Sequence, residues 1–169
     1  MWIPNASSNR HVTTSISQAA PVLIWSLFCT ALVFAMQAGF CCLETGLSRT
    51  KHSTNVALEK LVGFCVSAIV FWAFGYGLAF GATSGGIIGL GQLMPSDSAT
   101  LGGPGFFIFQ LMFCATSASI ISGAVAERMR FSAYVAIPCL ASGVLYPFVA
   151  HWAWAGADTG MHTGWLAAL

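Results

Sequence analysis

Three aromatic residues have the types and the spacing to attract a small cation. Phe109 and Phe113 are four positions apart, so both lie on one face if their segment is a helix. Counted from Phe106, Phe109 lies about one turn and Phe113 about 10 Å along that helix. Trp154 ends a later apolar stretch, at the same predicted level as Phe109. A ring face attracts a cation by about 0.5–2 kcal/mol as the cation loses water, so such a cluster could form the mouth of a path.

The same residues also fit ordinary packing and membrane-interface aromatics. Indole and phenyl rings are common at the ends of membrane helices, where an apolar body and a polar edge meet different solvents. The pattern alone favours this simpler interpretation. Rings placed deeper along a dry path would in addition block a hydrated ion.

Other kinds of chemistry have little support in the sequence. It contains no GxSxG, HExxH or Gly-rich phosphate loop, so we expect no enzyme. The four histidines have no ligand spacing and the six cysteines form no CxxC pair, so we expect no metal, cofactor or disulfide framework. The net charge of +1 gives no basic patch for nucleic acid.

Four stretches without Asp, Glu, Lys or Arg are long enough to cross a membrane: residues 21–43, 61–80, 106–126 and 131–154. About 20 helical residues span a ~30 Å hydrocarbon core, and in lipid a segment must satisfy its own backbone hydrogen bonds. The chain is 57% hydrophobic and 7% charged, which leaves too little polar sequence to cover a soluble core. We therefore expect an all-α membrane protein with four transmembrane helices.

The basic residues predict the orientation of these helices. The connection at residues 81–105 has no Lys or Arg, whereas the other two connections contain five of the six basic residues: Arg49, Lys51, Lys60, Arg128 and Arg130. Basic connections stay in the cytoplasm, so residues 1–20 and the tail at 155–169 are expected outside. No carboxylate, lysine or arginine is expected at depth, where ion-coupled carriers usually need one.

Small residues fill much of the third predicted span. Ala115 to Ser119, Ser122 and Gly123 would let neighbouring backbones approach closely, which is what drives helix packing in lipid. Gly75 and Gly77 could do the same in the second span. We expect the third span to be central in the bundle, and residues 55–60 to extend the second span as helix.

Three separated strings resemble the ammonium transporter family. They are QAGFCCLETG at residues 37–46, followed by Arg49-Thr-Lys51 and Asn55-Val; SGAVAERMRFS at 122–132; and YPFVAHWAW at 146–154. They occur in the order and spacing of that family and cover nearly all of residues 21–154. The AERMRFS portion is quite specific.

The resemblance implies a trimer whose subunits each hold a narrow apolar pore, built from two inverted five-helix repeats and a final helix. It implies an outer aromatic site that recruits ammonium, stacked phenylalanines that gate the path, and two facing histidines that handle the proton. Trp154 matches the recruitment tryptophan, Phe109 the aromatic at the mouth, and Phe113 a gating phenylalanine. Selectivity over potassium would then come from shedding a proton before neutral ammonia crosses a dry path.

The chain also departs from the family pattern. It stops at Leu169, before the fifth helix and its first pore histidine, and the second repeat is missing. Asp158, His151 and His162 do not match the family's pore aspartate and histidines. We therefore expect the N-terminal portion of the fold, truncated before the fifth helix, with residues 155–169 leading toward it.

The expected function is transport of ammonium or ammonia through an apolar pore. The expected location is the plasma membrane or bacterial inner membrane, and the complete protein is expected to be a homotrimer. One alternative is an ammonium-sensing membrane domain fused to a downstream signalling module. The other is a non-transporting membrane fragment.

Overall fold

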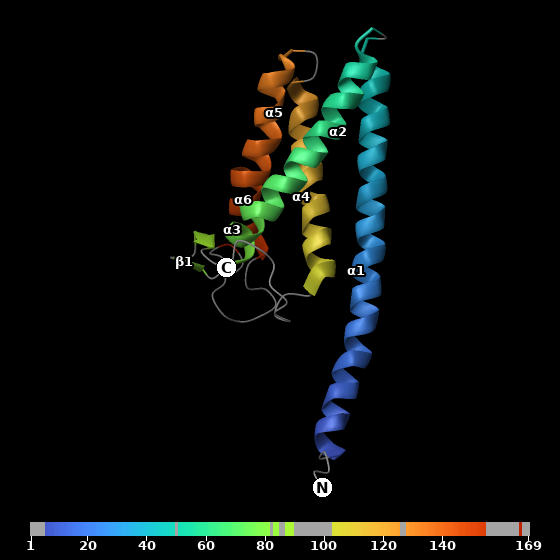
Figure 1. The fold of residues 1–169 in the computed structure, drawn as a ribbon, viewed down its shortest axis with the longest axis vertical. Helices are drawn as coiled ribbons and strands as arrows, with labels where there is room; N and C mark the ends of the chain where they lie inside the picture. Colours follow the sequence, from blue (N-terminus) through green and yellow to red (C-terminus); the bar gives the residue numbers. More distant parts are fainter. Residues whose placement is uncertain are drawn as a thin grey trace.

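The structure, a computed structural model, describes residues 6–49, 51–81, 83–84, 87–89, 103–125, 128–154 and 166. Its helices form four rods that run side by side (Figure 1). The first rod is α1 (Ala6–Leu47), and the second runs through α2 (Ser53–Val70), the π-helical turn η1 (Phe71–Gly75) and α3 (Tyr76–Phe80). The third is α4 (Gly103–Val125), and the fourth runs through α5 (Phe131–Leu140), the π-helical turn η2 (Ala141–Leu145) and α6 (Tyr146–Trp154).

Each rod contains a stretch that is long and apolar enough to cross a membrane: Leu23–Leu47, Ser53–Phe80, Pro104–Val125 and Phe131–Trp154. Little of these stretches is buried inside the bundle, and large apolar side chains such as Ile24, Phe28 and Leu61 are exposed. Such surfaces suit lipid and not water. The prediction of an all-α protein with four membrane-spanning helices is confirmed.

The helices are longer than the charge-free stretches that predicted them. α1 already begins at Ala6 and includes Pro21, so much of the segment at residues 1–20 is helical. α1 ends at Leu47 and α2 begins at Ser53, which confirms the helical reading of residues 55–60. The charge-free stretches are shorter than the helices because a charged side chain does not end a helix when its charge finds a partner or solvent.

α4 lies at the centre of the bundle and contacts α1, α2 and α5. Its small side chains are buried at these contacts: Ala115, Ala118, Ser119 and Ser122 are each at most 6% exposed. The predicted central position of this span is therefore confirmed, and the reason is that small side chains let the neighbouring helices approach.

The two π-helical turns pack against each other in the middle of the second and fourth rods. A Cβ atom on Gly75 would lie 2.8 Å from the backbone oxygen of Ser142, and one on Gly143 would lie 3.2 Å from Val70. Only glycine allows so close an approach of two backbones. The packing role expected for Gly75 is confirmed.

The Gly-rich connection contains a short hairpin beside α6. Strands β1 (Thr83–Ser84) and β2 (Ile88–Gly89) pair antiparallel, with Thr83 opposite Gly89. The indole Nε1 of Trp152 donates a hydrogen bond of 2.9 Å to the backbone oxygen of Ile87, which fixes the hairpin to α6. Most of residues 81–105, and the tail at 155–169 except Leu166, lie outside the described residues.

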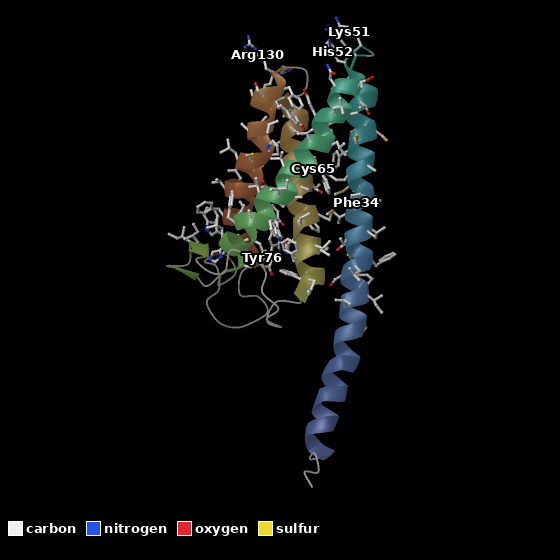
Figure 2. All side chains as sticks on the ribbon, viewed as in Figure 1. Phe34, Lys51, His52, Cys65, Tyr76 and Arg130 are labelled. Carbon is white, nitrogen blue, oxygen red and sulfur yellow. The ribbon has the colours of Figure 1, made fainter. Side chains whose placement is uncertain are left out.

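Both basic connections lie at one end of the bundle. Lys51, His52 and Arg130 are at this end, whereas Tyr76 is near the opposite end (Figure 2). The start of α4, the end of α6 and the hairpin lie at that opposite end (Figure 1).

Candidate substrate entrance

Phe109 and Phe113 form an aromatic pair on α4. Their ring centroids are 4.8 Å apart and the rings meet edge to face at 61°. This arrangement places the positive edge of one ring against the negative face of the other. Phe113 is 38% exposed and Phe109 is half-buried, so the pair lies on an open face of the bundle. The prediction that they share one helix face is confirmed.

Trp154 lies at the far end of α6 from the basic connections. It is the last residue of that helix and its side chain is 51% exposed. The start of α4 lies at the same end (Figure 1). Among the described residues, no ring contact joins Trp154 to Phe109 or Phe113. The structure thus brings the two phenylalanines together and places the indole at the same end of the bundle, without a ring contact to them among the described residues.

A second aromatic cluster, which the sequence analysis missed, positions this end of α4. Phe71 is fully buried and its ring lies 6.1 Å from that of Phe107 and 5.7 Å from that of Tyr146. The hydroxyl of Tyr146 donates a hydrogen bond of 2.6 Å to Gln110 Oε1. One further edge-to-face pair joins Tyr76 to Phe107. These contacts tie α4 to the second and fourth rods and hold its open face in place.

A buried ion pair holds the opposite end of the bundle. Lys60 Nζ lies 2.6 Å from Glu44 Oε1 and also donates hydrogen bonds to the Ser119 backbone oxygen and to Ser122 Oγ. Lys60 is only 8% exposed. Both residues lie outside the charge-free stretches at 21–43 and 61–80, but the helices α1 and α2 include them. The helical continuation at 55–60, which turns Lys60 toward α4, was the signal that could have found it.

The ion pair does not line the candidate entrance. Phe113 and Ser122 are nine residues apart, which is about two and a half helical turns, so they lie on opposite faces of α4. Gln37 strengthens the same junction, because its Nε2 donates to Ser119 Oγ at 2.7 Å. A Cβ atom on Gly123 would lie 2.8 Å from Glu44 Oε1, so only glycine leaves room for this carboxylate. Polar contacts with α1 and α2 thus occupy one face of α4, whereas Phe113 on the opposite face is exposed.

In the described part of the chain, no group of three or more His, Cys, Asp or Glu side chains could hold a metal ion. His151 is fully buried, with its Nδ1 2.9 Å from the backbone oxygen of Ala79, so it joins α6 to α3. The site can attract and partly dehydrate a small cation through ring faces.

These features define a multi-pass α-helical membrane protein with an aromatic site at one end. Residues 24–169 match the Ammonium Transporter Family, and the chain belongs to this family. A protein of Synechocystis sp. that is named as an ammonium transporter is 48% identical over 147 residues, which cover 85% of this chain and 27% of that protein. Ammonium transporter Amt2 of Archaeoglobus fulgidus is 38% identical over 164 residues, covering 96% of this chain and 34% of the relative.

A solved structure has the same fold. The Sensor Amt Protein is 34% identical and superposes with a TM-score of 0.87, covering 92% of this chain and 39% of that one. The resemblance noted in the sequence is thereby confirmed. The chain spans about a quarter to a third of the length of the curated relatives it matches.

Proposed function

We propose that this chain forms the N-terminal part of a transporter for ammonium or ammonia. The observation that carries the proposal is the Phe109–Phe113 pair, which lies on an open face of α4 toward the end where Trp154 is exposed. Five of the six basic residues belong to the opposite end of the bundle, and the sixth, Arg10, lies in the first turns of α1.

Each aromatic residue has a proposed role. Trp154 and Phe109 recruit ammonium at the outer mouth, where ring faces replace part of its water. Phe113 gates the path below, since a hydrated ion cannot pass an apolar constriction that gives it no ligands. Neutral ammonia can cross such a constriction once the proton is shed. The outer side is assigned from the basic connections, which the positive-inside rule places in the cytoplasm.

The open face of α4 is where further parts of the path would pack. Besides Phe113, it carries Ile120, which is 57% exposed. The chain spans only 27% and 34% of the two relatives described above, so the other wall of the path would come from the rest of a complete protein. We propose that the complete protein is a homotrimer in the plasma membrane or bacterial inner membrane.

Methylammonium uptake by the complete protein tests this function. Because a ring–cation contact contributes about 0.5–2 kcal/mol, Trp154→Ala should raise the half-saturating concentration by about 2- to 30-fold. Phe113→Ala should change the rate of uptake or its selectivity against potassium. Trp25→Ala and Phe28→Ala are matched controls, since these rings are also exposed but lie on α1. Unchanged uptake in both test variants would remove the proposed roles.

Sensing is the second candidate function, because a close structural neighbour is named as a sensor. A sensor would bind ammonium at the same aromatic mouth without net uptake. Binding of methylammonium by a complete protein that transports none would favour sensing. Uptake that depends on Phe113 would favour transport.

A further inference from the structure

His151 is a fully buried side chain to which the proposed transport function gives no role. Its Nδ1 lies 2.9 Å from the backbone oxygen of Ala79, which is also fully buried. Because a carbonyl oxygen can only accept a hydrogen bond, Nδ1 carries the hydrogen and is the donor. The two residues are 72 positions apart, so this bond joins the end of the second rod to the end of the fourth.

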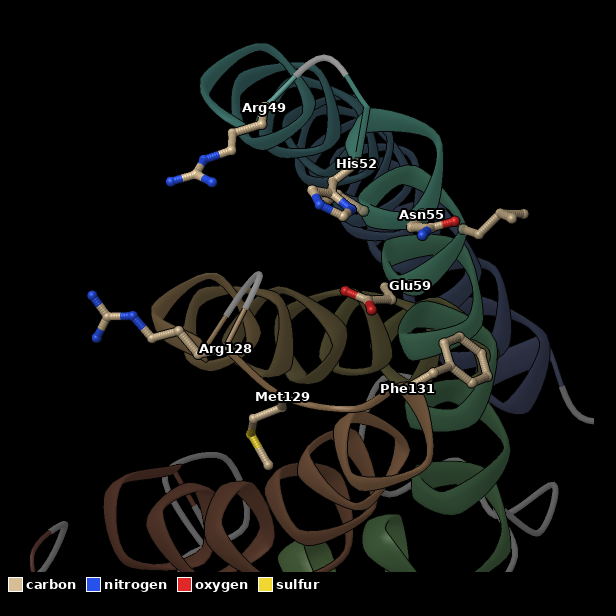
Figure 3. A pocket seen from close by; sticks show the side chains of 9 residues that line it. Arg49, His52, Asn55, Glu59, Arg128, Met129 and Phe131 are labelled. Carbon is tan, nitrogen blue, oxygen red and sulfur yellow. The ribbon is translucent and has the colours of Figure 1, made fainter.

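The pocket at the other end of the bundle does not involve this histidine. That pocket has a volume of about 730 Å³ and opens between the starts of α2 and α5 (Figure 3). Its charged lining residues are Arg49, Glu59 and Arg128, and His151 does not line it. The role of His151 therefore has to follow from the junction of α3 and α6, which it helps to form.

The end of α6 is held on two sides at this junction. α3 and strand β2 both contact α6, and they also contact each other. Ala150, the neighbour of His151 in the chain, is fully buried, so α6 is enclosed at this level. On the side of the hairpin, Trp152 Nε1 donates its hydrogen bond of 2.9 Å to the backbone oxygen of Ile87. The last turn of α6 thus has one anchor on α3, through His151, and one on the hairpin, through Trp152.

Trp154 lies at the end of this anchored turn. It is the last residue of α6 and follows His151 by three residues, so its backbone lies within one helical turn of the histidine. Its side chain is exposed. Helix ends fray unless contacts hold them, and an exposed indole adds little to hold its own backbone. The position of Trp154 therefore depends on the anchors earlier in the turn.

We propose that His151 is a positioning residue for the outer mouth. Its hydrogen bond to Ala79 fixes the last turn of α6 and so holds the Trp154 indole where it recruits ammonium. This inference rests on the proposed function of Trp154. When the bond is lost, the turn frays and the indole is in place for a smaller fraction of the time. The apparent affinity for ammonium then falls by that fraction, whereas the rate of passage at saturation is unaffected.

Methylammonium uptake by the complete protein with His151→Asn or His151→Gln tests the proposal. Both side chains are neutral amides, but they differ in reach. The amide nitrogen of Asn can take the place of Nδ1 and donate to Ala79, whereas that of Gln lies one methylene further out. His151→Gln should raise the half-saturating concentration about 2- to 10-fold, the range that one hydrogen bond contributes, and His151→Asn should stay within about twofold of the unmodified protein. The maximal rate should be similar in both.

Trp154→Ala separates a failure of this inference from a failure of the proposed function. If Trp154→Ala alone leaves the half-saturating concentration unchanged, the indole does not recruit ammonium and the proposed function of Trp154 is wrong. If it raises that concentration, His151→Gln should have no further effect in the same background, because no indole is left to position. Additive effects of the two substitutions would overturn the positioning role while leaving that of Trp154 intact.

Gln37→Leu is the matched control, because it also removes a side-chain hydrogen bond between two helices, that from Gln37 to Ser119. This bond joins α1 to α4 away from α6, so the half-saturating concentration should stay unchanged. An equal rise with Gln37→Leu and His151→Gln would show a general loss of stability and overturn the proposal. Equal effects of His151→Asn and His151→Gln, or a fall in the maximal rate alone, would overturn it too.

Discussion

Lys60 Nζ lies 2.6 Å from Glu44 Oε1, and this ion pair joins α1 to α2 beside the central helix α4. Two further hydrogen bonds, to Ser119 and Ser122, complete the coordination of the ammonium group. A buried charge is tolerated when its partner and its hydrogen bonds compensate for lost water. The junction therefore fixes three helices at the end that bears the basic connections.

Removing one member of this pair should destabilise the bundle strongly. Lys60→Met leaves the Glu44 carboxylate buried without its partner, so we expect a loss of about 3–5 kcal/mol in the free energy of unfolding. The double variant Glu44→Gln/Lys60→Met should recover much of that loss, because no charge is left buried. Denaturant unfolding in mild detergent, followed by circular dichroism, measures both.

Lys51→Met is the matched control for that experiment, since Lys51 is exposed in the α1–α2 connection. It should change stability by no more than about 0.5 kcal/mol. Equal losses from Lys51→Met and Lys60→Met would contradict a specific role for the buried pair.

Two glycines should respond in opposite directions to alanine. A Cβ atom on Gly75 would lie 2.8 Å from the Ser142 backbone oxygen and 2.8 Å from Phe71 Cδ2. Gly75→Ala should therefore cost about 1–3 kcal/mol by forcing the two π-helical turns apart. A Cβ atom on Gly39 would have nothing within 4 Å, so Gly39→Ala should stabilise α1 by about 0.5–1 kcal/mol. The same unfolding assay compares them, and equal signs would contradict the close packing of η1 on η2.

The proposed orientation predicts which positions an impermeant thiol reagent can reach. In a chain whose own cysteines are replaced by alanine, Lys51→Cys and Met129→Cys should react from the cytoplasmic side. Ile87→Cys should react only from the outer side, since Ile87 is exposed in the hairpin at the opposite end. Labelling of all three from one side would contradict four membrane crossings.

Patterns of short range in the sequence predicted much of the fold and part of the site. The separation of four residues predicts that Phe109 and Phe113 lie on one face of a helix. The structure confirms this prediction, because helix geometry alone determines which residues share a face. The small residues of α4 predicted its central position for a similar reason. The approximate level of Trp154 followed from the length of its rod.

Relations between helices could not be predicted in the same way. The absence of charge locates the apolar parts of the helices but not their ends, so it leaves Glu44 and Lys60 outside the predicted spans. Their pairing depends on how α1 and α2 cross, and the spacing of residues along the sequence does not predict that crossing. The aromatic cluster around Phe71 likewise joins three rods, and only the packed bundle brings its members together.

In the proposed transporter, the Phe113 face of α4 borders a path for the substrate and not the lipid. A cysteine in place of Phe113 in the complete protein tests it most directly, through its reaction with a small water-soluble thiol reagent added from outside. We expect a slow but measurable reaction that methylammonium retards and that Trp154→Ala alters. Reaction only with a lipid-soluble reagent, unaffected by methylammonium, would contradict it.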